Sequence, residues 1–195
     1  EFYNHLVDLT TNGSSVLLVT DNDLIQTSCD NDTLFCLPFR PKKGVELPEK
    51  VFGATSGNSP NTWILITSRG IELIDFNQKS ISLLATTKQI SSQPITSINR
   101  YKNRLIITTQ KEIYFFDLNS NKLTKPDYQP ALPENEVIKK SHLGNQNTIL
   151  LHTSGGIAMA STEGSWKWFN LRGYYPKGFM ANTLLTVLSD STGNL

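Results

Sequence analysis

The stretch Trp63-Ile64-Leu65-Ile66-Thr67-Ser68-Arg69-Gly70-Ile71 carries the pattern that decides the fold. It consists of a short apolar run, a threonine, three turn-type residues and one further apolar residue. The same order recurs in residues 16–24, 105–113 and 149–157, which places the four threonines at positions 20, 67, 109 and 153. Their spacings of 47, 42 and 44 residues mark an internal repeat, and a repeat of this length indicates similar structural units that stack on one another.

Each repeat extends on both sides of its threonine into four short apolar segments separated by turn residues. A fourth segment begins at Leu34, Ile81 and Leu123 in the first three copies, and at Trp166, one place early, in the last. The short connection between the second and third segments suits a hairpin. The second segment is apolar at successive positions, as expected of a strand that is buried on both faces. Each repeat therefore predicts a four-stranded antiparallel sheet.

Four-stranded units repeated about every 40–50 residues are typical of β-propeller blades. We therefore predict an all-β fold, a β-propeller segment of four four-stranded antiparallel blades plus the start of a fifth. The blades are expected at about 1–48, 49–93, 94–134 and 135–182, with a partial blade at 183–195. A β-sandwich would explain the number of strands but not the register of the threonines. Residues 133–143 have local helical character, which the repeat register overrides.

Composition excludes several classes of protein. The chain has 195 residues, 38% hydrophobic and 18% charged, which is apolar enough for a packed domain rather than a disordered tail. Its net charge of +1 gives no reason to expect nucleic acid as a partner. Aliphatic runs such as Val16-Leu17-Leu18-Val19 are far shorter than the roughly 20 residues that a membrane helix needs, so we expect no membrane insertion by this segment.

The repeats resemble a known family. Asp190-Ser191-Thr192-Gly193-Asn194-Leu195 and Thr153-Ser154-Gly155-Gly156-Ile157 are similar to the two-component-regulator propeller repeat. The segments 71–76 and 113–118, which contain Asp75 and Asp117, resemble the closing strand of that repeat. The glycine that precedes the threonine in the family is absent from all four copies, where Val19, Ile66, Thr108 and His152 stand instead.

The resemblance implies a ligand-sensing module on the periplasmic or extracellular side of a membrane protein. Such modules precede a membrane helix and a histidine kinase or diguanylate cyclase, and they sense polymer fragments such as oligosaccharides. The chain opens on Glu1 without an initiator methionine and closes on a turn before a new strand, so we expect a piece of a longer protein. The resemblance also makes a homodimer through that parent protein a candidate assembly.

No catalytic or cofactor-binding pattern stands out in the residues, so we predict no enzyme activity, no cofactor and no metal site. His5, His142 and His152 lack the spacing of metal ligands, and His152 lies within a buried-strand pattern. Asp21-Asn22-Asp23 resembles a calcium loop only superficially, because Ile25 stands where a calcium loop requires an oxygen ligand. We interpret that segment as a hairpin turn.

Cys29 and Cys36 flank a turn in the first repeat. Antiparallel pairing across that turn makes them a candidate disulfide if the compartment is oxidising, and two free thiols are the alternative.

Ligands of propellers usually lie at the face that carries the turns between strands two and three and the connections between blades. We therefore expect a ligand to contact Arg69, Lys111, Arg172, Lys177, Tyr174 and Tyr175. The expected face carries ten basic residues against seven acidic ones, which favours an anionic ligand, with ordinary solvated loop charges as the alternative. Aromatic side chains that could stack on sugar rings, or pack on the outside of blades, are Tyr128, Trp166, Trp168, Tyr174 and Tyr175.

Three functions follow from these observations. The first is a non-catalytic, extracytoplasmic sensing module that binds an anionic oligosaccharide. The second is a scaffold propeller that binds a protein partner through the same face. The third is a polysaccharide lyase or hydrolase. Because the terminal blades of an incomplete ring would expose apolar faces, we also expect the isolated chain to self-associate.

Overall fold

The computed structural model describes residues 6–30, 33–90, 93–144, 148–161 and 167–170. Blade 1 consists of β1 (Leu6–Asn12), β2 (Ser15–Thr20), β3 (Leu24–Asp30) and β4 (Thr33–Pro38). Blade 2 consists of β5 (Val51–Ser56), β6 (Thr62–Thr67), β7 (Gly70–Asp75) and β8 (Ser80–Thr86). Blade 3 consists of β9 (Ile95–Tyr101), β10 (Arg104–Thr109), β11 (Ile113–Asp117) and β12 (Lys122–Thr124). Blade 4 consists of β13 (Ile138–Leu143), β14 (Thr148–Thr153), β15 (Gly156–Ser161) and β16 (Lys167–Asn170).

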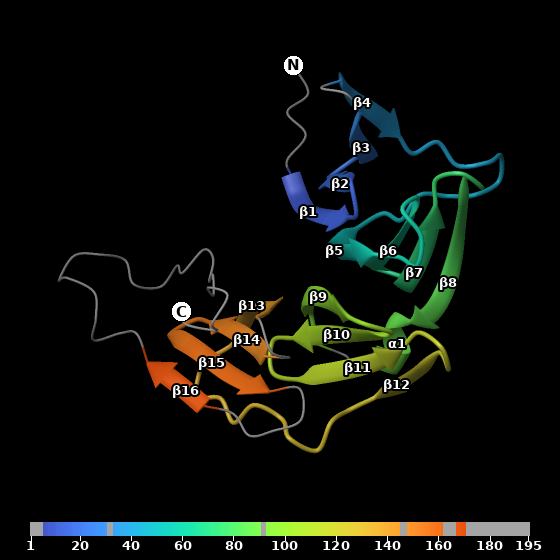
Figure 1. Cartoon of the computed structure of the whole chain (residues 1–195). Helices are drawn as coiled ribbons and strands as arrows, with labels where there is room; N and C mark the ends of the chain where they lie inside the picture. Colours follow the sequence, from blue (N-terminus) through green and yellow to red (C-terminus); the bar gives the residue numbers. More distant parts are fainter. Residues whose placement is uncertain (1–5, 31–32, 91–92, 145–147, 162–166, 171–195) are drawn as a thin grey trace. The chain divides into compact units, whose positions relative to one another are not determined.

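The prediction of an all-β propeller with four-stranded antiparallel blades is confirmed. In each of the four sheets, neighbouring strands follow the order of the chain and pair antiparallel (Figure 1). Within the described residues the only helix is the four-residue α1 (Thr87–Ile90). Residues 138–143 form β13, as the repeat register predicted. The fifth blade, predicted at 183–195, lies outside the described residues.

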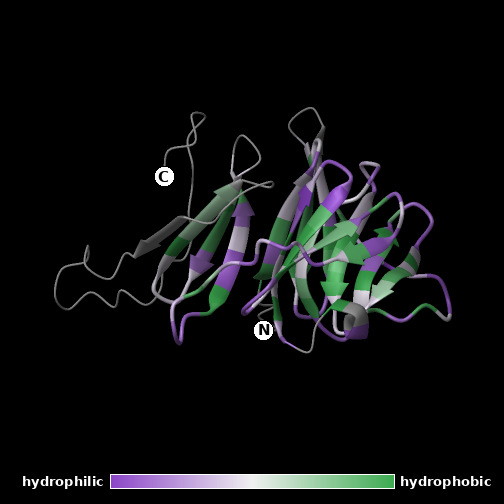
Figure 2. Cartoon of the chain, turned by 90° about the horizontal axis from the view of Figure 1, so that it is seen from below, coloured by the Kyte–Doolittle hydropathy of each residue, from purple (hydrophilic) through white to green (hydrophobic). Residues whose placement is uncertain are grey.

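The chain divides into two compact units, residues 1–92 with blades 1 and 2, and residues 93–195 with blades 3 and 4. Figure 2 shows the apolar residues running along the strands and the polar ones gathered in the connections. This distribution follows from the repeat, because each blade buries strand residues against its neighbour and leaves the turns in water.

The repeated threonines close the central hairpin of every blade. Thr67 Oγ1 accepts hydrogen bonds from the backbone N–H groups of Arg69 (3.1 Å) and Gly70 (3.3 Å). The hydroxyls of the other three threonines accept from the amides two and three residues further on, at 2.9–3.4 Å. A threonine can satisfy two turn amides in this way, and it also favours the strand that precedes the turn. The hydroxyl is therefore the physical reason for the threonine register.

Replacing one of these threonines tests that role. Thr67→Val removes a fully buried hydroxyl that serves two turn amides and the carboxylate of Glu72, so we expect a loss of about 1–3 kcal/mol of unfolding free energy. Urea denaturation measures the loss. Thr67→Ser should retain most of the stability because it keeps the hydroxyl, and Thr33→Val, at an exposed strand position, should change it little. A Thr67→Val protein as stable as the Thr33→Val protein would contradict this role.

A β-bulge in the first strand of each blade was not foreseen. The strand register shifts between Leu6 and Asp8 in β1 and between Val51 and Gly53 in β5, directly next to the residue paired with the anchoring threonine. β9 and β13 carry the same irregularity opposite Thr109 and Thr153. Bulges bend a strand and redirect side chains at the end of a sheet. In blade 1 the extra residue is Val7.

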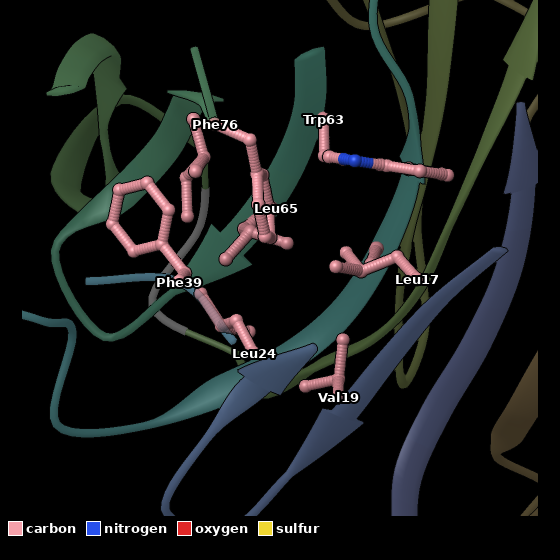
Figure 3. Packing of buried hydrophobic residues seen from close by; sticks show 9 residues of the cluster. Leu17, Val19, Leu24, Phe39, Trp63, Leu65 and Phe76 are labelled. Atoms are coloured by element: carbon pink, nitrogen blue, oxygen red, sulfur yellow. The ribbon is translucent and has the colours of Figure 1, made fainter. Parts of the chain in front are cut away.

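Blades 1 and 2 share one hydrophobic core. Leu17, Val19 and Leu24 of blade 1 face Trp63 and Leu65 of blade 2 (Figure 3). Phe39, which follows β4, meets Phe76 edge to face with ring centroids 5.0 Å apart.

Polar side chains join the first strands of the two blades. Asp8 Oδ2 accepts a hydrogen bond from the amide of Ala54 (2.8 Å), which links β1 to β5. The first unit is thus held by packing and by specific hydrogen bonds between blades.

Hydroxyl groups make the corresponding contact in the second unit. Ser97 Oγ lies 2.7 Å from Ser141 Oγ and 2.6 Å from Thr108 Oγ1, and it accepts from the amide of Ser141. Asn99 Nδ2 donates to Ser141 Oγ (2.8 Å). Because these hydroxyl and amide groups satisfy one another, they can be buried where β9 and β13 approach closely.

The expectation that strand two is buried on both faces is confirmed in β6, β10 and β14, whose last five residues are all buried. It is wrong for β2, in which buried and half-buried residues alternate. In that strand Leu17 and Val19 contact blade 2, whereas Val16 and Leu18 point to the opposite face, which blade 2 does not cover. The apolar run in β2 is therefore not evidence that both faces of this strand are buried.

Blade 1 carries most of the exposed large apolar side chains of the described residues. Six of the seven belong to this blade: Leu6, Val7, Leu9, Leu34, Phe35 and Leu37. Exposed apolar side chains are typical of association surfaces, and self-association through blade 1 stays a prediction.

We expect the purified chain to self-associate through this surface. Leu34→Lys should raise the dissociation constant about tenfold, because burying a leucine side chain contributes about 1.5–3 kcal/mol. Sedimentation velocity over a range of concentrations measures the change. Leu83→Lys in β8 is the matched control, since Leu83 is similarly exposed but lies in blade 2. A wild-type chain that sediments as a monomer at every concentration would refute the expectation.

Candidate functional site

Arg69, the first residue predicted to bind a ligand, is engaged within the protein. Its Nη2 lies 2.8 Å from Glu72 Oε1 and donates to the carbonyl of Glu46 (3.2 Å). Glu72 is only 3% exposed. A buried carboxylate needs such partners, and Thr67 Oγ1 supplies another at 2.6 Å. Arg69 retains 40% exposure and can still share its guanidinium with a ligand.

Lys111 occupies the equivalent place in blade 3, two residues after the anchoring threonine. Its Nζ donates to the carbonyl of Glu136, in the connection that leads to β13. The carboxylate of Glu136 accepts from Ser154 Oγ at 2.6 Å and from Thr153 Oγ1 at 3.4 Å. In both units, therefore, a basic residue of the hairpin turn binds a backbone carbonyl of a connection between blades. The structure gives both residues a structural role, and their ligand-binding role stays a prediction.

The other four predicted site residues, Arg172, Lys177, Tyr174 and Tyr175, lie outside the described residues, as does Trp166. Trp168 belongs to β16, but its side chain is not among those described. Tyr128 packs on the core of the second unit, with its ring 6.3 Å from that of Phe115. Its aromatic plane therefore serves packing, which was one of the two interpretations of this residue.

A cluster of charged and hydroxyl groups lies beside the hairpin turn of blade 3. Glu112 accepts from Lys125 Nζ and from the hydroxyl of Tyr114. The hydrogen bond from Lys125, followed by that from Tyr114, lowers the pKa of Glu112, and the carboxylate in turn raises the pKa of Lys125. Glu112 therefore stays ionised at neutral pH and is a poor general acid.

His152 is a core residue, as its strand pattern indicated. The side chain is 6% exposed, and burial lowers its pKa, with smaller contributions from His142 and Lys139. The imidazole is therefore neutral at pH 7. Within the described ranges, no three His, Cys, Asp or Glu side chains cluster closely enough to hold a metal ion. His5 lies outside those ranges.

The candidate disulfide remains a prediction. Cys36 is an exposed free thiol, and the side chain of Cys29 is not among those described. The strand register pairs Cys36 with Thr27 and Cys29 with Leu34, so the two cysteines are diagonal rather than directly opposite.

One pocket of about 380 Å³ opens in the first unit, between the hairpin turn of blade 1 and the connection that leads into β5. Its apolar lining includes the buried Leu24 and the half-buried Leu47, Pro48 and Val51, and the half-buried Thr20 and Asp23 lie beside them. Its charged lining consists of Asp21, Asp23, Glu49 and Lys50. The volume is within the range of small-molecule sites. The bulge residue Val7 also lines the pocket.

The pocket lies on the expected ligand face, which carries the turns between strands two and three and the connections between blades, but none of its lining residues was a predicted ligand contact. Asp21-Asn22-Asp23 was interpreted as a hairpin turn, which the bonds from Asn22 and Asp23 to Thr20 confirm. Residues 47–51 carried no motif. The pocket forms only because a turn and a connection some 25 residues away converge on the same core, a juxtaposition that local patterns do not contain.

The fold and these sites define a β-propeller protein. No helix in the described part of the chain is both long and apolar enough to span a bilayer. No family model matches the sequence, and no curated protein matches it. Similarity to solved structures therefore provides the comparison.

The chain resembles extracellular domains of bacterial sensors. One neighbour is the extracellular domain of a hybrid two-component system from B. thetaiotaomicron, with a TM-score of 0.68 and 12% identity over 98% of this chain and 25% of that chain. A second such domain from the same organism has a TM-score of 0.58 and 18% identity, covering 85% of this chain and 24% of that chain.

A third neighbour is PorZ, a surface component of the type-IX secretion system of Porphyromonas gingivalis. Its TM-score is 0.55 at 10% identity, covering 86% of this chain and 23% of that chain. The chain spans about a quarter of the length of these three neighbours. At such low identity the likeness establishes the propeller fold.

Proposed function

We propose that this chain is a non-catalytic, ligand-sensing propeller segment on the periplasmic or extracellular side of a membrane-bound signalling protein. The observation that carries the proposal is the match over 98% of the chain to the extracellular domain of a hybrid two-component system. The resemblance of the repeats to the two-component-regulator propeller supports it independently. Transmission of the signal, and a homodimer, belong in this proposal to the parent protein.

The ligand proposed is an anionic oligosaccharide. Arg69 and Lys111 stand at equivalent turns of two blades, and Arg172, Lys177, Tyr174 and Tyr175 are the further candidates. Arginine and lysine supply charge-assisted hydrogen bonds to carboxylate or sulfate groups, and tyrosine rings stack on sugar rings. Because Arg69 and Lys111 already bind neighbouring carbonyls, a ligand would add to bonds that hold the connections between blades.

Isothermal titration with two oligosaccharides of equal length tests this proposal. We expect heat and a saturable curve with oligogalacturonate, which is anionic, and none with a neutral maltooligosaccharide. Arg172→Gln and Lys177→Gln should each weaken binding about tenfold, because a charge-assisted hydrogen bond contributes about 1.5–3 kcal/mol. Lys122→Gln, at an exposed position in β12, is the control.

Two results would overturn it. A folded chain that produces no heat with either sugar, yet retains one defined protein in a pull-down from lysate, would indicate the scaffold function. Shortening of the oligosaccharide during incubation would indicate an enzyme.

A further inference from the structure

The pocket between the hairpin turn of blade 1 and residues 47–51 has a composition that the proposed anionic ligand does not fit. Three of its four charged lining residues are carboxylates, Asp21, Asp23 and Glu49. The fourth is Lys50. A site for an anion would bring carboxylates and ligand into repulsion, so this pocket calls for a different ligand chemistry.

Only one of the three carboxylates that line the pocket takes part in an ion pair between described residues. Asp23 pairs with Arg40, whose Nη1 lies 3.2 Å from Asp23 Oδ1. The ammonium of Lys50 lies over the ring of Phe52, 5.2 Å from its centroid. Asp21 and Glu49 take part in none of the ion pairs between described residues. Even with Arg40 included, three carboxylates stand against two cations, so these side chains carry a net negative formal charge.

The least exposed side chains of the pocket lining are mostly apolar. Leu24 belongs to the core shared by the two blades, and Leu47 and Val51 pack against that core. Figure 3 shows Leu24 at the edge of this cluster, beside Val19 and Phe39. These side chains are held by the core whether or not a ligand is present, so the apolar surface is preformed. Buried and half-buried apolar side chains together with the exposed carboxylates Asp21 and Glu49, which we call the rim, suit a molecule with an alkyl body and a cationic head.

We propose that this pocket binds a small organic cation, a primary ammonium group on a short alkyl body. The ammonium lies between Asp21 and Glu49 at the rim, and the alkyl group lies against Leu24, Leu47 and Val51. This site is distinct from the residues proposed for the oligosaccharide, and the inference stands or falls independently of the sensing function.

Three probes of the same size separate charge from apolar contact: pentylammonium, pentanol and pentanoate. Titration into the ¹⁵N-labelled 195-residue chain should shift the amides of residues 20–24 and 49–51 with pentylammonium, with a dissociation constant in the millimolar range. Pentanol should bind more weakly, and pentanoate should not shift these amides. Raising the salt concentration should weaken the binding of pentylammonium, because the carboxylates are solvent-exposed.

Charge-neutral variants identify the rim. Asp21→Asn and Glu49→Gln should each weaken the binding of pentylammonium about two- to fivefold, the range of exposed ion pairs. Glu134→Gln, an exposed carboxylate in the second unit, should leave it unchanged. Equal binding of all three probes, no shift in a folded spectrum, or indifference to both variants would each overturn the inference. Binding of pentylammonium without any binding of oligogalacturonate would leave this site intact and refute only the proposed ligand of the sensing function.

Discussion

Gly70→Ala is expected to unfold the first unit. Gly70 opens β7 with φ of +150°, a backbone conformation that residues with a Cβ rarely adopt. A Cβ at this position would stand 1.8 Å from the carbonyl oxygen of Ala85 and 2.9 Å from Thr86 Cα on the paired strand β8. Both contacts are with backbone, so no side-chain rotation relieves them. We expect a loss of at least about 3 kcal/mol, a large part of the stability of an ordinary domain.

Hydrogen exchange locates the damage. Amide protection should fall in β6 and β7, while β10 and β14 in the second unit serve as the internal reference. Gly13→Ala is the matched control, because Gly13 also has a positive φ, of 63°, but nothing lies within 4 Å of its added Cβ. That variant should cost only about 1–2 kcal/mol from backbone conformation. If the two alanine variants proved equally stable, the close approach to Ala85 would not be real.

Trp63→Ala is expected to have the second-largest effect. The side chain of Trp63 is fully buried between the blades, and its Nε1 donates to Gln26 Oε1 at 2.9 Å. Gln26 Nε2 in turn donates to Asn61 Oδ1 at 2.7 Å. Removing the indole leaves a cavity at the centre of the first unit and takes a partner from a buried amide. Such substitutions cost about 3–5 kcal/mol.

Trp63→Phe separates the cost of the cavity from the cost of the lost hydrogen bond. Phenylalanine retains much of the apolar volume but lacks the N–H donor, so we expect a loss of about 1–3 kcal/mol, the cost of an unsatisfied buried group. The urea midpoint, followed by far-ultraviolet circular dichroism, measures both variants. Gln26→Met combined with Trp63→Phe completes a double-mutant cycle for the hydrogen bond. Alanine and phenylalanine variants of equal stability would show that the cavity contributes nothing.

The basic residues predicted to bind a ligand show what local sequence patterns reveal and what they miss. Their spacing from the threonines correctly marked Arg69 and Lys111 as turn residues. It did not reveal that each binds a carbonyl of a neighbouring connection, because Glu46 and Glu136 lie more than 20 residues away along the chain. The burial of Glu72 is hidden from local patterns for the same reason. An acidic residue in a strand suggests solvent, and only the partners Arg69 and Thr67 explain its burial.

The threonine register and the alternation of apolar and turn residues were sufficient for the strands, their order and the propeller class. Those features depend on hydrogen bonds within one hairpin and on the periodicity of one strand. Both are determined by residues that lie close together in the sequence. The tertiary structure alone decided that β2 is covered on one face, that bulges lie opposite the threonines, and that residues 20–24 and 47–51 enclose a pocket. Burial and cavities depend on which other segment packs against a surface, and no local pattern in the sequence records that.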